Sequence, residues 1–303
     1  MKIAETIEAL RLWTAEQRAQ GKTIGFVPTM GFLHEGHMSL VDEAKRHTDL
    51  TVMSIFVNPL QFGPNEDLER YPRDLERDQA MAEQRGVDLL FVPSVAEMYP
   101  QATKTVIQVS GVTERLCGAS RPGHFDGVAT VVCKLFNIVQ PNYAFFGQKD
   151  AQQVAVIQQM VQDLNLPVHV VPCPIVREKD GLAMSSRNVY LNDEERKQAL
   201  VLSQSLLEAR TAYGKGNSPQ EVKQTILNRI SSQPLADIDY VEILSYPALE
   251  AIETFDDSAF LIALAVRFGK TRLIDNLLIM EGKGREQHAA NDDECQNTPS
   301  YSY

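Results

Sequence analysis

Cysteine is scarce in this chain of 303 residues. The four cysteines, Cys117, Cys133, Cys173 and Cys295, show no CxxC spacing. The sequence therefore predicts neither a disulfide framework nor a cysteine-based metal cluster, and its cysteine usage is typical of a reducing cytosol.

Long apolar runs and clustered basic residues are missing as well. No stretch of about 18 apolar residues occurs, so we expect no transmembrane span. The opening residues Met-Lys-Ile-Ala-Glu-Thr lack the apolar core of a signal peptide. The formal net charge is −11 and the pI is about 5.1, which argues against a broad nucleic-acid surface. We expect a cytoplasmic protein with no nucleic-acid or membrane partner.

Apolar strand patterns and amphipathic helix patterns alternate over the first half of the chain. The strands are short and almost wholly apolar, as expected when both faces of a sheet are covered. The alternation predicts an α/β fold with a parallel, doubly wound sheet. The predicted strands are 23–28, 50–57, 88–93, 143–147 and 168–172, and the predicted helices are 3–20, 37–47, 73–85, 126–139 and 150–164.

The pattern changes after about residue 176. Capping-box sequences at 192–195 and 218–221 predict two helices, the first of which ends near residue 213. Strands are predicted at 238–244, 259–268 and 271–280, the last two joined by a hairpin turn. We therefore predict a domain over residues 1–176 and a smaller α+β domain over 177–282. The polar segment 283–303 is predicted to be a disordered tail.

Polar side chains follow three of the predicted strands. His34 and His37 follow the first, residues 58–61 follow the second, and residues 147–150 follow the fourth. In open parallel sheets, ligands bind beyond the carboxyl ends of the strands. The sequence therefore predicts one site at that edge.

Two segments indicate what this site binds. His34 and His37 share one side of the turn at a helix N-terminus, a position that attracts anions. Zinc proteases space their histidines four apart, so we favour a polyphosphate pocket over a metal site. The alternative is that one histidine caps the helix and the other is exposed. The segment 184–187, Met-Ser-Ser-Arg, offers hydroxyl and guanidinium donors to phosphate, although such stretches are often solvated loops.

Together these segments resemble the paired signatures of the nucleotidyltransferase superfamily, whose members attack the α-phosphate of ATP and release pyrophosphate. Over about residues 1–280 the chain resembles the pantothenate synthetase family. The matching segments are 28–31 with 34–37, 56–62, 71–73, 121–125, 147–153, 184–187 and 271–276. The tail after about residue 282 departs from the usual end of the family.

The resemblance implies a Rossmann-like N-terminal domain, a smaller C-terminal domain that closes the site, and a cytoplasmic homodimer. It implies that ATP and Mg²⁺ are used to join pantoate to β-alanine through a pantoyl adenylate, with release of AMP and pyrophosphate. We expect no dedicated cage of protein ligands for Mg²⁺, because this ion is held mostly by phosphate oxygens and water. The apolar segment 50–57 and its following loop are candidates for the dimer interface.

The resemblance also implies roles for individual residues. His34, His37 and Lys149 are the catalytic candidates, with His37 as the proton donor. Gln61 and Gln153 would bind pantoate, and Gln61 would also lie near β-alanine. The implied ATP-binding residues are Met30, Gly31, Phe32, Leu33, His34, Glu35, Gly36, His37, Gly147, Gln148, Lys149, Asp150, Val176, Met184, Ser185, Ser186 and Arg187.

Several of these positions have simpler interpretations. A surface lysine at a helix start is disfavoured by the helix dipole, so a functional Lys149 is favoured. Asp150 is expected to cap that helix as well as lie near the ribose. Asn58 is a weaker candidate for a substrate-binding residue. Arg121 and His124 either contact phosphate or belong to an ordinary turn. The acidic residues between positions 66 and 78 are interpreted as a solvated helix face.

Two other functions compete with a ligase. A simple nucleotidyltransferase would need a cationic pocket for a phosphorylated substrate, and it gives no reason for two glutamines in the site. A nucleotide-binding module without catalysis would not need Lys149 or His37. A P-loop kinase is excluded because no Gly-x-x-x-x-Gly-Lys-Ser/Thr segment occurs.

Overall fold

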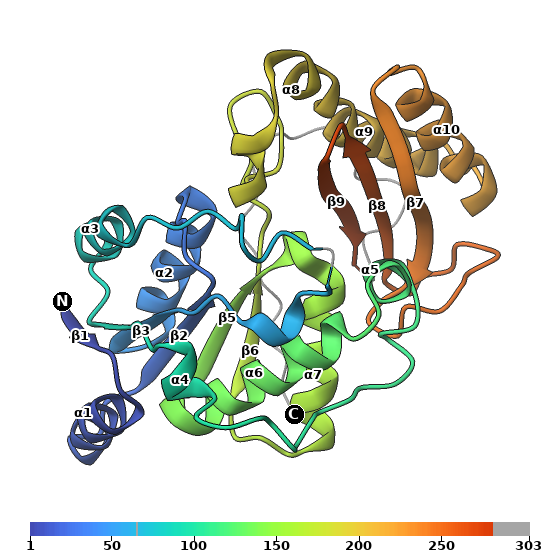
Figure 1. The fold of residues 1–303 in the computed structure, drawn as a ribbon. Coiled ribbons are helices and arrows are strands. Elements are labelled where there is room, and N and C mark those ends of the chain that lie inside the picture. The colour runs from blue at the N-terminus through green and yellow to red at the C-terminus, as the bar shows by residue number, and fades with distance from the viewer. Residues whose placement is uncertain (65, 281–303) are drawn as a thin grey trace.

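The computed structural model describes residues 1–64 and 66–280, which form an α/β domain and a smaller C-terminal domain (Figure 1). The first domain contains a six-stranded sheet in the order β1-β4-β3-β2-β5-β6, and every pair in it is parallel. The predicted fold class is confirmed, whereas the predicted tail lies outside the described residues. The strands are β1 (Lys2–Ala4), β2 (Ile24–Thr29), β3 (Leu50–Ile55), β4 (Leu89–Phe91), β5 (Tyr143–Gly147) and β6 (His169–Cys173).

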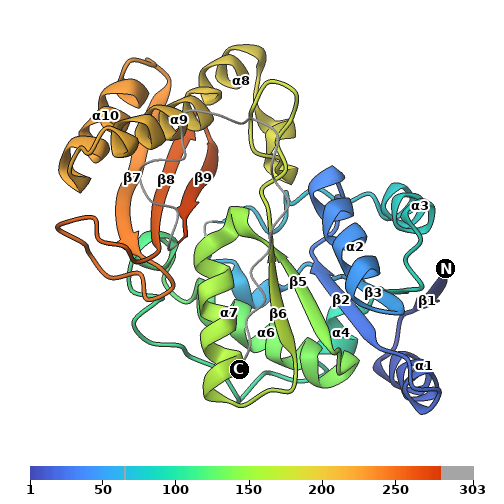
Figure 2. The same ribbon diagram turned by 180° about the vertical axis from the view of Figure 1, so that it is seen from behind.

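Helices cover both faces of this sheet because successive strand side chains are apolar on both sides. Phe26 of β2 packs in one core cluster and the adjacent Val27 packs in another. The first cluster includes side chains of α1 (Ile7–Ala19), α6 (His124–Val139) and α7 (Ala151–Asp163). The second includes side chains of α2 (Glu35–His47) and α3 (Leu75–Arg85). Figure 2 shows the molecule from the side on which α2 covers the sheet.

One prediction for this domain needs correction. The helix predicted over 3–20 begins only at Ile7, because residues 2–4 pair with β4 as the edge strand β1. A three-residue strand is too short to produce a periodic signal. Strand β3 lies between β2 and β4, so both of its edges are paired within this sheet. The dimer interface predicted at segment 50–57 and its following loop stays a prediction. The short helices α4 (Val95–Met98) and α5 (Leu116–Ser120) were not predicted.

Strand β2 lies where the winding of the sheet reverses. From β2 the chain runs outward through β3 and β4, and it then crosses to β5 and β6 on the other side. The carboxyl ends of β2 and β5 therefore flank the topological switch point, where doubly wound sheets bind their ligands. This places the segments after β2 and β5 at one crevice.

The C-terminal domain is an antiparallel sheet, β7-β8-β9, covered on one face by helices. The helix predicted from 192 to 213 is two helices, which meet at Leu200. Leu244 and Leu261 of this sheet join the core of the first domain, so the two domains share an apolar contact. The elements are α8 (Asp193–Ala199), α9 (Val201–Gly214), α10 (Pro219–Ser231), β7 (Ala236–Ser245), β8 (Phe260–Phe268) and β9 (Thr271–Ile279).

Two polar contacts also fix β9 against the first part of the chain. The Asn276 side-chain amide donates to the backbone carbonyls of Gln148 and Lys149 at 2.9 and 2.8 Å. The Arg177 guanidinium donates to both carboxylate oxygens of the buried Asp275 at 2.6 and 3.0 Å.

The domain boundary predicted at residues 176 and 177 stays a prediction. In the described part of the chain, no helix is long and apolar enough to span a bilayer.

Removing Arg177 is expected to destabilise the protein. Arg177→Ala would leave the Asp275 carboxylate buried without its cation, and we expect a loss of about 3 kcal/mol in the free energy of unfolding. This is the low end for a buried pair, because Arg177 is 31% exposed. Urea denaturation measures the loss. The double variant Arg177→Ala/Asp275→Asn should recover part of it, and equal stabilities of wild type and Arg177→Ala would contradict this role.

Candidate active site

The turn after β2 brings His34 and His37 together. Gly31 has φ +80° and Phe32 has φ +48°, so the chain reverses tightly before α2 begins. The His34 backbone N–H donates to Nδ1 of His37 at 3.3 Å, and the two ring centroids are 4.0 Å apart. His34 occupies the N-cap position, yet its buried Nδ1 has no hydrogen-bond partner among the described residues.

Both imidazoles are held uncharged near neutral pH. Burial, followed by the positive charge of Lys149, lowers the pKa of His34 to about 4. Burial, followed by His34 and Lys149, lowers the pKa of His37 well below its ordinary value. Because Nδ1 of neutral His37 accepts a backbone N–H, the ring proton lies on Nε2. His37 therefore presents a neutral N–H donor.

Lys149 lies on the short 3₁₀ helix η2 (Gln148–Asp150), directly after β5. In residues 1–64 and 66–280 its ammonium forms no ion pair with a carboxylate. Asp150 precedes α7 at the N-cap position, but its side chain accepts no capping hydrogen bond. The predicted capping role of Asp150 is therefore wrong. Lys149 is left as an uncompensated cation beside the two imidazoles.

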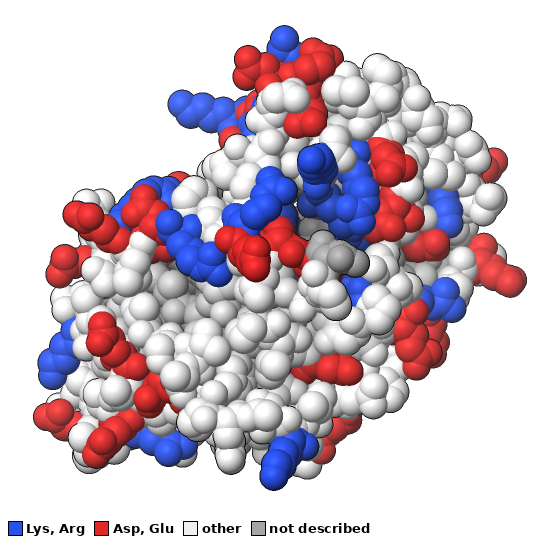
Figure 3. Space-filling model, viewed as in Figure 1, with Lys and Arg blue, Asp and Glu red and all other residues white. Residues whose placement is uncertain are grey.

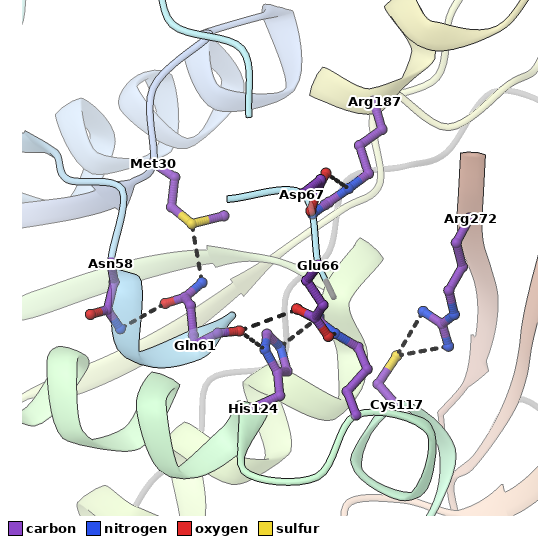
Figure 4. Close-up of polar contacts among 10 residues, drawn as sticks. Met30, Asn58, Gln61, Glu66, Asp67, Cys117, His124, Arg187 and Arg272 are labelled. Carbon is purple, nitrogen blue, oxygen red and sulfur yellow. Dashed lines mark hydrogen bonds and ion pairs between the residues drawn. The ribbon is translucent and has the colours of Figure 1, made fainter. Parts of the chain in front are cut away.

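A second polar group follows β3. The buried Asn58 donates to Oε1 of Gln61 at 3.1 Å, and Gln61 Nε2 lies 3.1 Å from the Met30 sulfur. These contacts fix the Gln61 amide, so it is not a solvated side chain. Figure 4 shows this amide between Asn58 and Met30. Gln153 of α7 lines the same cavity as Gln61.

The segment 184–187 closes against the turn after β2. The Ser186 hydroxyl donates to the carbonyl of Phe32 at 3.3 Å. The Met184 backbone N–H donates to the carbonyl of Val176 at 3.0 Å. The two sequence signatures, although about 150 residues apart in the chain, are therefore in direct contact.

Two cavities, of about 240 and 1280 Å³, lie between these segments and share part of their lining. Lys149, Gln153 and Arg187 line both of them. Lys and Arg side chains gather around the hollow between the two domains in Figure 3. The predicted residues that line the smaller cavity are Met30, His34, Gly36, His37, Gln61, Gly147, Lys149, Asp150, Gln153, Val176, Met184, Ser185, Ser186 and Arg187.

Five predicted residues line neither cavity. Gly31, Phe32 and Leu33 form the turn behind the histidines, and Gln148 is buried under the C-terminal domain. Glu35 is directed to Arg85, whose guanidinium lies 2.8 Å from its carboxylate. Their predicted contacts with a nucleotide stay predictions.

Two acidic residues that the sequence did not single out hold the arginines of the site (Figure 4). Glu66 pairs with Arg121, and Asp67 accepts two hydrogen bonds of 3.0 Å from Arg187. Burial acts to raise the pKa of each carboxyl group, but its guanidinium partner outweighs burial and lowers the pKa below its ordinary value. The predicted solvated helix face is therefore wrong for Glu66 and Asp67.

Arg121 is also joined to the third histidine of the site. Its Nη1 lies 3.0 Å from Nε2 of His124, and Nδ1 of His124 lies 2.8 Å from the Gln61 carbonyl. Burial, followed by Arg121, lowers the pKa of His124 to about 4. Arg121 and His124 therefore line both cavities, and their segment is also a turn, in which the His124 N–H donates to the Arg121 carbonyl at 3.1 Å. Their contact with phosphate stays a prediction. No group of three or more metal-binding side chains occurs in the part of the chain that is described.

The His34 ring depends on a glycine two residues later. A Cβ at position 36 would lie 2.9 Å from His34 Cε1 and Nδ1. We expect Gly36→Ala to displace this ring and to weaken ATP binding by about tenfold or more, as measured by calorimetry. Gly214→Ala is the control, because a Cβ there meets no atom within 4 Å. Equal affinities of Gly36→Ala and wild type would contradict the placement of His34.

Comparison with known proteins identifies the family of this chain. Residues 2–278 match the family model described as pantoate-beta-alanine ligase. A pantothenate synthetase from Acetivibrio thermocellus is 58% identical over 280 residues, which are 92% of this chain and 99% of that protein. The crystal structure of pantothenate synthetase from Thermus thermophilus has a TM-score of 0.87 at 48% identity, covering 91% of this chain and 99% of that one.

A third relative was crystallised with ligands. The pantoate-beta-alanine ligase from Francisella tularensis, complexed with beta-gamma ATP and beta-alanine, has a TM-score of 0.73 at 34% identity. The alignment covers 92% of this chain and 97% of that chain. The family match extends over both domains and over every segment of the site described above. This chain belongs to the pantoate-beta-alanine ligase family.

Proposed function

We propose that this enzyme condenses pantoate with β-alanine, using ATP and releasing AMP and pyrophosphate. The observation that carries the proposal is a single cavity lined by two chemically different groups of side chains. We call the imidazoles, Lys149 and the segment 184–187 its phosphate side, and the amides of Gln61 and Gln153 its amide side. The Francisella tularensis relative, which is complexed with beta-gamma ATP and beta-alanine, supports this choice of substrates.

The chemistry explains why the site needs donors and cations. A carboxylate is a poor electrophile, so an amine does not attack it directly. A pantoate carboxylate oxygen would attack the α-phosphorus of ATP, and pyrophosphate would leave. The amine of β-alanine would then attack the acyl carbon, form the amide bond and expel AMP. Transfers of this kind are catalysed mainly by positioning and electrostatics, so no protein nucleophile is needed.

We assign the phosphate side of the cavity to ATP. Lys149 supplies a fixed charge for the transferring phosphate, and the Nε2 proton of His37 supplies a donor to an oxygen that becomes negative as pyrophosphate departs. Because His37 is neutral, it donates without adding a second buried cation next to Lys149. Ser185 and Ser186 supply hydroxyl groups to the same cavity.

Arg187 is expected to change partners when ATP binds. In the structure its guanidinium is occupied by Asp67, which is a bidentate pair of the kind that also recognises phosphate. A triphosphate would compete with Asp67 for these donors. Backbone and apolar contacts with the nucleotide would come from Met30, Gly36, Gly147 and Val176.

The amide side of the cavity suits a hydroxy acid. Gln61 and Gln153 can each donate and accept, which matches the hydroxyls and carboxylate of pantoate. Gln61 is held by Asn58, so its orientation is fixed before a substrate arrives. The family resemblance also implies that Gln61 would lie near β-alanine.

Three further parts of the proposal rest on the family resemblance. Mg²⁺ would enter with ATP, held by phosphate oxygens and water. This fits a cavity rich in cationic and neutral donors, and the ion would draw charge from the phosphates. The enzyme would be a homodimer, with the apolar segment 50–57 and its following loop as the candidate interface. It would act in the cytoplasm.

Loss of Lys149 is expected to remove adenylate formation and to leave the fold intact. Lys149→Ala should lower the rate of pantoate-dependent pyrophosphate release by about 10²–10³-fold, because a preorganised charge is lost. Lys197→Ala, which removes an exposed lysine of α8, is the control. Near-normal turnover of Lys149→Ala, at an unchanged melting temperature, would rule out this role.

The histidines predict an unusual pH dependence. The pKa of His34 lies near 4 and that of His37 lies well below its ordinary value, so both rings stay neutral as the pH falls through 6.5. The kcat/KM for ATP, measured as pyrophosphate release, should therefore show no histidine limb between about pH 5.5 and 7.5. An acid limb with a midpoint near 6.5 would show that an imidazole is charged in this range.

Product analysis tests the proposed function itself. The purified enzyme is incubated with ATP and Mg²⁺, with pantoate and β-alanine added singly and together. Pantoate alone should release at most one equivalent of pyrophosphate per site, and sustained AMP formation should require both substrates. Sustained pyrophosphate release with another acid or a phosphate ester, and none with pantoate, would favour a simple nucleotidyltransferase.

A further inference from the structure

Asp78 is a buried carboxylate with an unusual pair of partners. It lies on α3, is 1% exposed, and accepts hydrogen bonds from the backbone N–H groups of Phe32 and Leu33 at 2.7 Å each. A charge buried in a protein is costly unless hydrogen bonds satisfy it. The acidic side chains on this part of the chain were expected to be solvated, and Asp78 is instead directed into the turn after β2.

The turn needs such a partner. Gly31 and Phe32 both have positive φ, and Phe32 adopts this left-handed conformation without being a glycine. Consecutive N–H groups in a turn of this kind form a concave site for an anion, and the anion here is the carboxylate of Asp78. Arg77 from the same helix lies over the Phe32 ring at 5.2 Å, which adds a second contact between α3 and the turn.

The turn that Asp78 holds leads directly to the groups proposed to contact ATP. The carbonyl of Phe32 accepts the Ser186 hydroxyl, and Leu33 is followed by His34. The His34 N–H in turn orients the His37 ring through Nδ1. A shift of this turn would therefore move both imidazoles and the Ser186 loop together.

We infer that Asp78 is a positioning residue for the ligase reaction, whose carboxylate fixes the turn that sets the two imidazoles and Ser186 against ATP. The inference rests on the proposed function. Both carboxylate oxygens are needed, because two N–H groups require two acceptors. An asparagine would present its NH₂ group to one of them.

Ionisation of the same carboxyl group does not stabilise the fold. Burial, which outweighs the Phe32 and Leu33 hydrogen bonds and the Arg77 charge and is reinforced by Asp74, raises the pKa of Asp78. A raised pKa means that ionisation of Asp78 is harder in the folded chain than in the unfolded chain. Its contribution to stability therefore falls as the pH rises through the folded pKa. A neutral residue is expected to keep the melting temperature while it loses the turn geometry.

The test compares Asp78→Asn with Asp74→Asn. Asp74 caps the same helix through the Arg77 N–H and makes no contact with the turn. We expect Asp78→Asn to lower kcat/KM for ATP by at least about tenfold with KM for β-alanine and the melting temperature little changed. Asp74→Asn should keep wild-type kcat/KM. Wild-type kcat/KM in Asp78→Asn, or a loss that only follows a fall in melting temperature, would overturn the inference.

Hydrogen exchange keeps the inference testable if Asp78→Asn does not fold or the ligase activity is not found. In the wild-type enzyme without substrates, the amides of Phe32 and Leu33 should exchange as slowly as those of the neighbouring strand β2. Rapid exchange of these two amides would refute the role of Asp78 whatever the enzyme catalyses. Slow exchange together with absence of pantoate-dependent turnover would refute the proposed function alone.

Discussion

The site depends on keeping the number of uncompensated positive charges in the cavity small. Lys149 carries a positive charge without a carboxylate partner among the described residues. Burial, reinforced by this charge, lowers the pKa of His34 and His37 and keeps both rings neutral. A second and third cation in the same space would repel Lys149 and would raise the cost of closing the cavity. Neutral imidazoles avoid this repulsion and still provide N–H donors, so one cation and several dipoles face the reacting phosphate.

The positive charges of the two arginines in the site are balanced in a similar way. Arg121 and Arg187 line the cavity, and each is neutralised by an acidic residue of the loop that follows η1 (Pro59–Gln61). The C-terminal domain is coupled to this arrangement, because Asn276 binds the backbone of Lys149 and Ser186 binds the turn that carries the histidines. Contacts between the domains therefore set the positions of the groups that meet ATP.

Much of the fold was predictable because it rests on local patterns. The alternation of apolar strands and amphipathic helices indicated the parallel sheet, and the Gly-containing turns marked the strand ends that carry the site. The edge strand β1 and the division of α8 from α9 escaped because each involves few residues. The convergence of His34, Lys149 and Gln61 followed from strand polarity alone. The partners of Glu66, Asp67 and Asp78 did not, because they lie far along the chain and leave no periodic signal.

The most direct measurement follows an oxygen atom. Pantoate labelled with ¹⁸O in its carboxylate is converted by the enzyme in the presence of ATP, Mg²⁺ and β-alanine, and the AMP is examined by mass spectrometry. If the carboxylate attacks the α-phosphorus and the amine then attacks the acyl carbon, one labelled oxygen per turnover is transferred to AMP. Unlabelled AMP would contradict an acyl adenylate, and with it the assignment of the two sides of the cavity.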